Sequence, residues 1–308
     1  MVIILTKQVL IMFLLILVGF FMFRKEKITM EGSKALGNIL LYISLPSVIV
    51  KSFLVEKTSE MIHSIGFSMI AALLSLLIAM GISRVLFRQD GIAAFAGAFS
   101  NPGFFGIPLI ASSVNEKAVI YIASYIAFLN LFQWSYGVML LTNNSGKKCM
   151  EIKKLLLKMI KAPFMIAIVI GSIIFLSNWQ IASILKNSIG YLAGLNTPIA
   201  MFVVGVYLAQ TDWKKMIRDR RLYFISLVKL LVVPFAVCIL LQIFFKDTLS
   251  DMKIAILIAS ACPVGSNIVV YAQLYDSDYT YAVETVVVST LLSVITIPFI
   301  MNFGIRFF

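Results

Sequence analysis

Two prolines and two glycines fall within seven residues of an apolar segment, in the stretch Ser100-Asn101-Pro102-Gly103-Phe104-Phe105-Gly106-Ile107-Pro108-Leu109. Each proline removes a backbone donor and its ring collides with the preceding helical turn, whereas glycine tolerates the open backbone that results. The stretch therefore predicts a membrane helix that is broken near the bilayer midplane. Because lipid offers no partner to a freed backbone group, such groups must face protein or a wet cavity, where they can bind a ligand. A kinked but tightly packed helix is the alternative.

A second stretch, Ala261-Cys262-Pro263-Val264-Gly265-Ser266-Asn267, has the same ingredients in a later apolar segment. Asn101 and Asn267 offer hydrogen-bond donors and acceptors without a buried charge. A half-helix that starts after each break presents its positive end to an anion. The predicted substrate-binding residues are Asn101, Pro102, Gly103, Gly106, Pro108, Pro263, Gly265, Ser266 and Asn267.

The composition places these breaks in a membrane. Of the 308 residues, 61% are hydrophobic and only 13% are charged, which excludes a soluble enzyme, a secreted disulfide scaffold and a disordered chain. A net charge of +12 indicates contact with anionic lipid rather than with nucleic acid. We expect an all-α polytopic protein with ten transmembrane segments, at roughly 8–23, 35–54, 62–86, 92–113, 118–141, 162–178, 187–210, 222–245, 253–274 and 279–302.

The long polar stretch 142–161 divides the chain into residues 1–141 and 162–308, with five segments in each part. Since five is odd, related halves would be inverted with respect to the membrane. With the N-terminus outside, 17 of the 26 Lys and Arg residues fall on the inner side and 8 on the outer side. The positive-inside rule therefore predicts a multi-pass protein of the plasma membrane with both termini outside and a cytoplasmic linker.

Charged residues inside the segments are candidates for coupling or gating. Lys229 and Glu284 lie at similar predicted depths, so they form an ion pair, or Glu284 carries a proton, or Lys229 snorkels and Glu284 faces lipid or the surface. Asp276 and Asp278 follow the ninth segment as a solvated cap or as gating groups.

Other polar and aromatic residues carry weaker predictions. His63 is the single histidine and is expected at the interface, so neither a zinc site nor a Ser–His pair at depth is expected. Gln133 is a candidate for the cavity. The three tryptophans are interpreted as belt residues at the membrane boundaries: Trp134, Trp179 and Trp213.

The motif Asn101-x-Gly103-x-x-Gly106-x-Pro108-Leu109 resembles the fourth helix of the auxin efflux carrier family, the bacterial relatives of the plant PIN-formed carriers. Pro263-x-Gly265 with Tyr271-Ala272-x-x-Tyr275-x-x-Asp278 resembles the ninth helix of that family, and Thr197-Pro198 with Gly205-x-x-Leu208-Ala209 resembles its seventh. The resemblance implies two inverted five-helix repeats, a scaffold part and a transport part, with the broken fourth and ninth helices crossing at the substrate site. It also suggests a homodimer.

Two departures from the family pattern limit what the resemblance implies. Pro102 stands where many relatives have a small hydroxyl residue, so a side-chain ligand is missing there. The long hydrophilic loop of the plant carriers is absent, so their control by phosphorylation is not implied.

The resulting prediction is a secondary transporter for a small organic anion that works by alternating access. It is not expected to be an enzyme, and we expect no cofactor and no metal. The wider superfamily includes bile acid–sodium symporters, so the coupling ion is H⁺ or Na⁺. The alternatives are a sodium-coupled organic-acid symporter and a channel or membrane sensor on the same fold.

Overall fold

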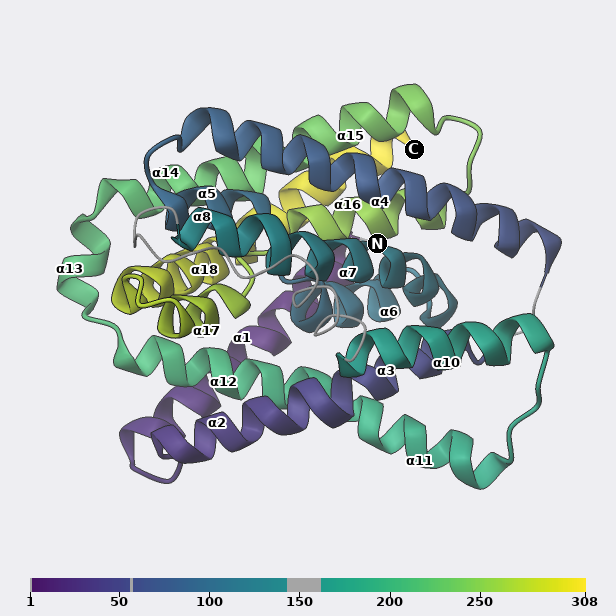
Figure 1. The fold of residues 1–308 in the computed structure, drawn as a ribbon, viewed down its shortest axis with the longest axis horizontal. Coiled ribbons are helices and arrows are strands. Elements are labelled where there is room, and N and C mark those ends of the chain that lie inside the picture. Colours follow the sequence, from purple (N-terminus) through teal and green to yellow (C-terminus); the bar gives the residue numbers. More distant parts are fainter. Residues whose placement is uncertain (1, 56–57, 143–161) are drawn as a thin grey trace.

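The computed structural model describes residues 2–55, 58–142 and 162–308, which are mainly helical (Figure 1). The predicted linker 142–161 lies outside these ranges except for Thr142. Within them the β-structure is limited to one antiparallel bridge between Ser100 and Val264. Up to Thr142 the elements are α1(Val2–Arg24), α2(Met30–Ile39), η1(Leu40–Ser44), α3(Leu45–Phe53), α4(Ser59–Leu86), α5(Gly91–Ala98), η2(Pro102–Gly106), α6(Ile107–Ser113), η3(Glu116–Ala118), α7(Val119–Phe132), η4(Gln133–Gly137) and α8(Val138–Thr142).

From Pro163 onward the elements are α10(Pro163–Ser177), α11(Ser183–Gly194), α12(Asn196–Gln210), α13(Trp213–Arg218), α14(Arg220–Leu227), η5(Val228–Val232), α15(Val233–Phe244), α16(Ser250–Ala261), α17(Asn267–Leu274) and α18(Tyr279–Phe307). The elements η1, η4 and η5 are π-helical turns inside longer helices, η2 is a π-helical turn that begins the half-helix Pro102–Ser113, and η3 is a 3-10 turn. π-helical turns are rare and occur frequently at functional sites.

Seven helices in the described ranges are long and apolar enough to cross a membrane: Ile3–Arg24, Met30–Phe53, Met61–Leu86, Glu116–Thr142, Ser183–Gln210, Arg220–Phe244 and Tyr279–Phe307. The expected fourth and ninth segments are not among them because each is interrupted by a break. The expected sixth segment is a helix of 15 residues, α10, which is short for a span. Ten spans therefore remain a prediction.

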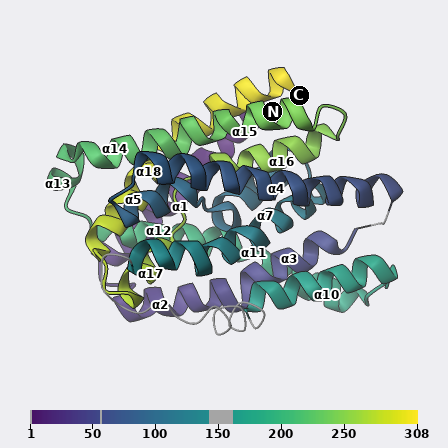
Figure 2. The same ribbon diagram turned by 45° about the horizontal axis from the view of Figure 1, so that its top comes forward.

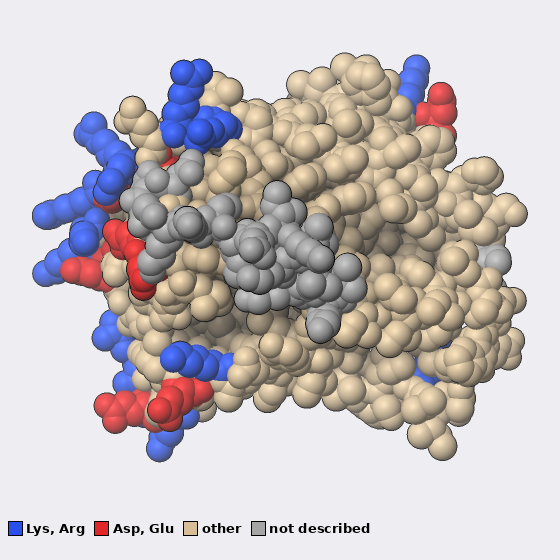
Figure 3. Space-filling view, in the orientation of Figure 1, with Lys and Arg blue, Asp and Glu red and all other residues tan. Residues whose placement is uncertain are grey.

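Lys, Arg, Asp and Glu side chains gather mostly at one end of the molecule, over α13 and the neighbouring helix ends, and uncharged residues make up most of the rest of the visible described surface (Figure 3). Large apolar side chains that would contact water in a soluble protein are exposed on many helices, including Leu14, Phe21, Ile70, Val85, Ile173, Leu176, Ile239, Ile243, Ile295 and Phe299. A belt of this kind is stable only against lipid. The chain is an all-helical, multi-pass membrane protein.

At the charged end, polar contacts connect the N-terminal ends of helices α5, α14 and α18. The Tyr281 hydroxyl donates to Asp90 Oδ2 at 3.0 Å, and the Arg221 guanidinium lies 5.1 Å from the centre of the Tyr281 ring. Arg221 also pairs with Asp219 at 2.9 Å. The hydrogen bonds from Arg221 lower the pKa of the Asp219 carboxyl. These contacts hold α5, α14 and α18 in register at this end.

The helices pack as two groups. The panel group consists of α1–α3 and α10–α12, in which α1 packs on α12 and α3 packs on α10 and α11. The crossing group consists of α4–α8 and α14–α18, in which α4 packs on α5, α7, α15 and α16, and α18 packs on α14 and α16. Much of the panel group lies along the lower edge of Figures 1 and 2. The seam between the groups joins α1 to α6 and α18, and α12 to η2.

Glycines allow the central helices of the panel group to approach backbone to backbone. A Cβ atom on Gly19 would lie 2.5 Å from the Phe202 carbonyl oxygen, and one on Gly205 would overlap the Ile16 carbonyl oxygen. Neither position accepts a side chain without moving α1 away from α12. Small residues at such interfaces are a general device of membrane helices.

Candidate functional site

Both predicted breaks are present. Helix α5 ends at Ala98, and the chain runs in extended form until the half-helix Pro102–Ser113 begins. Helix α16 ends at Ala261, and α17 begins at Asn267 after an extended Cys262. In each case proline and glycine stand where the helical hydrogen bonds stop, as expected from the missing amide and the missing Cβ.

The two breaks are hydrogen-bonded to each other. The Asn101 N–H donates to the Pro263 carbonyl at 2.9 Å, and the Gly265 N–H donates to the Phe99 carbonyl at 3.0 Å. A third backbone donor, the Val264 N–H, reaches the Ser289 hydroxyl on α18 at 3.1 Å. The breaks therefore satisfy backbone groups that would be costly in lipid. This pair of bonded breaks is called the crossing below.

The close approach of the two breaks requires glycine at position 265, which has no Cβ atom. A Cβ atom there would lie 2.8 Å from the Ser100 carbonyl oxygen and 3.3 Å from Gln133 Nε2. Gly106 is also close-packed, since its Cβ would lie 2.8 Å from Ile122 Cδ1. Both positions belong to the predicted site, and both act by letting segments approach closely.

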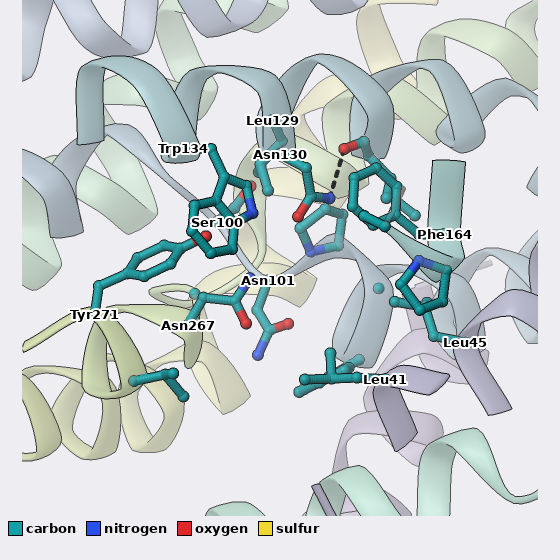
Figure 4. Close-up of a pocket in the computed structure, with 18 of the residues that line it drawn as sticks. Leu41, Leu45, Ser100, Asn101, Leu129, Asn130, Trp134, Phe164, Asn267 and Tyr271 are labelled. Atoms are coloured by element: carbon teal, nitrogen blue, oxygen red, sulfur yellow. Dashed lines mark hydrogen bonds between the residues drawn. The ribbon is translucent and has the colours of Figure 1, made fainter. Parts of the chain in front are cut away.

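A cavity of about 310 Å³ lies beside the crossing (Figure 4). We call it the amide cavity, because Asn101, Asn130 and Asn267 contribute its polar wall. None of the described residues that line it is charged. The π-helical turns η1, η2 and η4 all contribute to it. Its described lining is Leu41, Tyr42, Leu45, Ser100, Asn101, Pro102, Gly103, Phe104, Ile126, Leu129, Asn130, Trp134, Ala162, Pro163, Phe164, Gly265, Asn267, Val270 and Tyr271.

The amide side chains are held by neighbours. Asn101 Nδ2 donates to the Ser266 hydroxyl at 3.4 Å, and Asn267 Nδ2 donates to Gln133 Oε1 at 3.0 Å. Asn130 Nδ2 donates to a carbonyl of its own helix at 2.8 Å, the bond drawn dashed in Figure 4. In the same view, the side chains of Asn101 and Asn267 lie next to each other across the crossing. The amides thus form one polar surface with fixed orientation.

The predicted site residues divide into two sets. The structure places Asn101, Pro102, Gly103, Gly265 and Asn267 in the wall of the amide cavity. The other four support the crossing or face elsewhere: Ser266 holds Asn101, Pro263 accepts the Asn101 amide, Gly106 packs on Ile122, and Pro108 lines a second cavity.

The second cavity, of about 410 Å³, lies against the later part of the half-helix that starts at Pro102. We call it the lysine cavity, because Lys51, Lys117 and Lys186 line it. Lys51 pairs with Glu116 at 3.0 Å, which joins α3 of the panel group to η3 beside the crossing group. One half-helix thus has a cavity at each of its two parts.

Sequence reasoning missed three of the polar or aromatic groups at the site. Asn196 donates from Nδ2 to the Gly103 carbonyl at 2.9 Å, so the start of α12 satisfies a carbonyl of the broken helix. Asn130 and Trp134 lie four residues apart and therefore share one helix face with the predicted Gln133 nearby. That polar stripe in an apolar segment was a usable signal. Gln133 itself is fully buried, and its Nε2 has no partner in the described parts of the chain.

Trp134 corrects the belt interpretation. It lines the amide cavity and makes an edge-on contact with Tyr271, with ring centroids 5.1 Å apart. Trp179 is 65% exposed, and Trp213 packs on Phe20 with centroids 6.5 Å apart. His63 is exposed on α4.

Of the alternatives for Lys229 and Glu284, the ion pair is not formed among the described residues. Both residues are buried, but Lys229 Nζ has no hydrogen-bond partner among the described residues, and Glu284 Oε1 also has none. Glu284 follows Tyr281, which belongs to the charged end, by three residues, so it lies about one helical turn from it. The two spans do lie close together, since η5 packs on α18, but they turn these side chains toward different surroundings.

The aspartates after the ninth segment have separate roles. Asp278 caps α18 by accepting a hydrogen bond from the Tyr281 N–H at 2.9 Å. Asp276 lies in the left-handed region at φ 53° and takes part in the turn before α18. The cap interpretation of Asp278 therefore has direct support. No cluster of three or more metal-ligating side chains is found within the described ranges.

Two interrupted helices that cross within an apolar, multi-pass helical protein, beside a polar cavity, define the class of membrane transport proteins. Comparison with known families agrees: residues 4–301 match the family described as "Membrane transport protein", and the chain belongs to this family, that of the auxin efflux carriers. A relative from Rhizobium meliloti (strain 1021), named "Putative malonate transporter", is 25% identical over 303 residues. The alignment covers 95% of this chain and 93% of that relative. The family resemblance read from the motifs is confirmed.

Proposed function

We propose that this protein is a secondary transporter that moves a small organic anion across the plasma membrane by alternating access. The observation that carries the proposal is the amide cavity of about 310 Å³ beside two hydrogen-bonded helix breaks. Transporters commonly bind substrate between discontinuous helices, because the broken backbone exposes groups that a continuous helix would use internally.

Chemistry at the crossing favours an anion. The half-helix beginning at Pro102 and α17 beginning at Asn267 both start at the crossing, and neither has a side-chain cap. The first amides of a helix have no acceptor within the helix, and the N-terminal end carries partial positive charge. The Asn101 and Asn267 amides add polar groups in the same wall. The malonate in the name of the relative supports a small carboxylate as substrate.

In the proposed architecture, residues 1–141 and 162–308 form two inverted five-helix repeats with ten spans in total. The panel group would act as scaffold and the crossing group as the moving part, with the amide and lysine cavities as the two faces of the route. Both termini would lie outside, H⁺ or Na⁺ would couple transport, and the protein would pair as a homodimer in the lipid. The two cavities along one half-helix support alternating access.

The test is binding and flux with purified protein. Affinities for malonate and for a panel of small carboxylates are measured by calorimetry, and uptake into proteoliposomes is measured against substrate concentration. We expect saturable flux and an affinity that falls by about tenfold or more in Asn101→Ala, because one hydrogen bond to a charged group contributes about 1.5–3 kcal/mol. Asn267→Ala should behave alike. The control is Asn187→Ala, an exposed amide on α11.

Two results would overturn the proposal. One is the absence of binding and flux for every carboxylate in well-folded protein. The other is unchanged affinity in both Asn101→Ala and Asn267→Ala, which would make the amides packing elements. Flux that rises linearly without saturation would favour a channel instead.

A further inference from the structure

Lys229 is fully buried in the middle of an apolar span, on the π-helical turn η5. Its ammonium has no hydrogen-bond partner among the described residues. An unpaired charge at this depth is costly, and side chains of this kind in membrane spans usually serve function. The position of Lys229 therefore calls for a counter-charge.

The turn η5, which carries Lys229, packs on α5 and α16, the two half-helices that end at the crossing. Cys262 is the C-cap residue of α16. The Sγ atom of Cys262 would lie 3.4 Å from a Cβ atom on Gly106, on the broken fourth helix. Lys229 thus stands beside both interrupted segments.

No acidic partner comes from the helices around it. The elements packed on η5 are α5, α14, α15, α16 and α18. Their titratable and charged side chains are Arg220, Arg221 and Tyr223 on α14, Cys238 on α15, Asp251 and Lys253 on α16 with Cys262 at its C-cap, and Tyr279, Tyr281, Glu284 and Arg306 on α18. Of the acids, Asp251 lies in the first turn of α16, remote from the crossing, and Glu284 lies about one helical turn from Tyr281 of the charged end. The half-helices α5 and α16 end at the crossing, and a helix C-terminus offers only about half a negative charge.

The amide cavity, in contrast to the surroundings of Lys229, lacks a positively charged side chain. Its described lining contains no cation, although it lies against the same crossing (Figure 4). Neutral amides and helix N-termini orient a carboxylate but leave its full charge uncompensated in a low-dielectric environment. A buried cation without an anion and a site for an anion without a cation thus both lie next to the crossing.

We propose that Lys229 is the counter-charge of the bound organic anion, acting across the crossing without touching the substrate. The proposal rests on the proposed function and deepens it, since it assigns the substrate a charge. One ammonium neutralises one carboxylate, so the site selects a singly charged acid over a doubly charged one of the same shape. Lys229 is a positioning residue that acts through the field it creates at the cavity.

The experiment uses three probes with one skeleton and different charge: malonate, monomethyl malonate and dimethyl malonate. Affinities are measured at neutral pH for the wild type, Lys229→Gln, Lys229→Met and Lys229→Arg, with Lys246→Gln as an exposed control for the loss of one positive charge. Unit charges separated by roughly 12 Å at an effective dielectric constant of about 20 change an affinity about tenfold.

We expect Lys229→Gln and Lys229→Met to bind monomethyl malonate about tenfold more weakly than the wild type and to bind the neutral diester equally well. Lys229→Arg should retain most of the affinity for the monoanion, and Lys246→Gln should match the wild type. The ligand-free Lys229→Met variant should also melt at or above the wild-type temperature, because an apolar residue replaces an unpaired charge.

Two results with the Lys229 variants would overturn the proposal. Equal loss of affinity for all three probes, together with a lowered melting temperature in Lys229→Met, would overturn the proposal and leave Lys229 a packing residue. Unchanged affinity for both anions in Lys229→Gln would overturn it as well. If the wild type binds neither anion, the proposed function itself fails, which separates that outcome from a failure confined to Lys229.

Discussion

Replacing Gly265 by alanine tests whether the crossing depends on close backbone approach. The added Cβ would lie 2.8 Å from the Ser100 carbonyl oxygen, whereas ordinary contact begins at 3.4 Å. The two breaks must separate by several tenths of an ångström, and the obstacle is backbone rather than a flexible side chain. The bonds that lengthen are Gly265 N–H to Phe99 and Asn101 N–H to Pro263.

The expected loss of stability follows from those two bonds. Each buried hydrogen bond contributes about 0.5–1.5 kcal/mol, so the variant should lose about 1–3 kcal/mol. For a chain of this size, each kcal/mol corresponds to a fall of about 2–4 °C in Tm. Since the crossing carries Asn101 and Asn267, affinity for the organic anion should fall by about tenfold or more, the equivalent of one hydrogen bond to a charged group.

The assay is thermal unfolding in detergent, with anion affinity measured on the same preparation. The matched control is Gly81→Ala on α4, where a Cβ atom meets nothing within 4 Å and the substitution should be neutral or slightly stabilising. If Gly265→Ala keeps both the Tm and the affinity of the wild type, the crossing tolerates a side chain and the close-approach argument is refuted.

Two further predictions concern groups found by the structure. Asn196→Ala removes the donor to the Gly103 carbonyl and should lower stability by about 1–3 kcal/mol, seen as a lower Tm than that of the exposed control Asn187→Ala; equal melting temperatures would contradict it. Binding of malonate should change the intrinsic fluorescence of Trp134 in the amide cavity, so Trp134→Phe should abolish the change and the exposed Trp179→Phe should keep it; a signal that survives in Trp134→Phe would place the ligand elsewhere.

The membrane setting and the broken helices were readable in the sequence because they depend on local chemistry. An apolar fraction of 61% admits few other environments. Proline and glycine act on the backbone of their own segment, so Pro102, Gly103, Pro263 and Gly265 predicted breaks wherever the segments came to lie. The family resemblance rested on these same positions.

The partners of the breaks were harder to predict. Asn101 and Ser266 are 165 positions apart, and their contact depends on how the helices pack. The expectation that the freed backbone groups face protein or a wet cavity agrees with the bonds between the two breaks, because the cost of an unpaired group in lipid leaves few alternatives. The additional donor Asn196 was not found, since nothing in its own segment marks which carbonyl it reaches.

Rotation about a helix axis affects where the side chains of Trp134 and Lys229 point. Depth in the membrane follows from residue count at about 1.5 Å per residue, so the depth of Lys229 was estimable from the sequence. The direction of each side chain was not, because both residues lie on π-helical turns, η4 and η5. A π-helical turn adds a residue, which rotates the residues that follow by about 100° relative to an ideal helix. Residue composition and local backbone chemistry thus specified the environment and the breaks, whereas packing of distant helices specified which groups meet at the crossing.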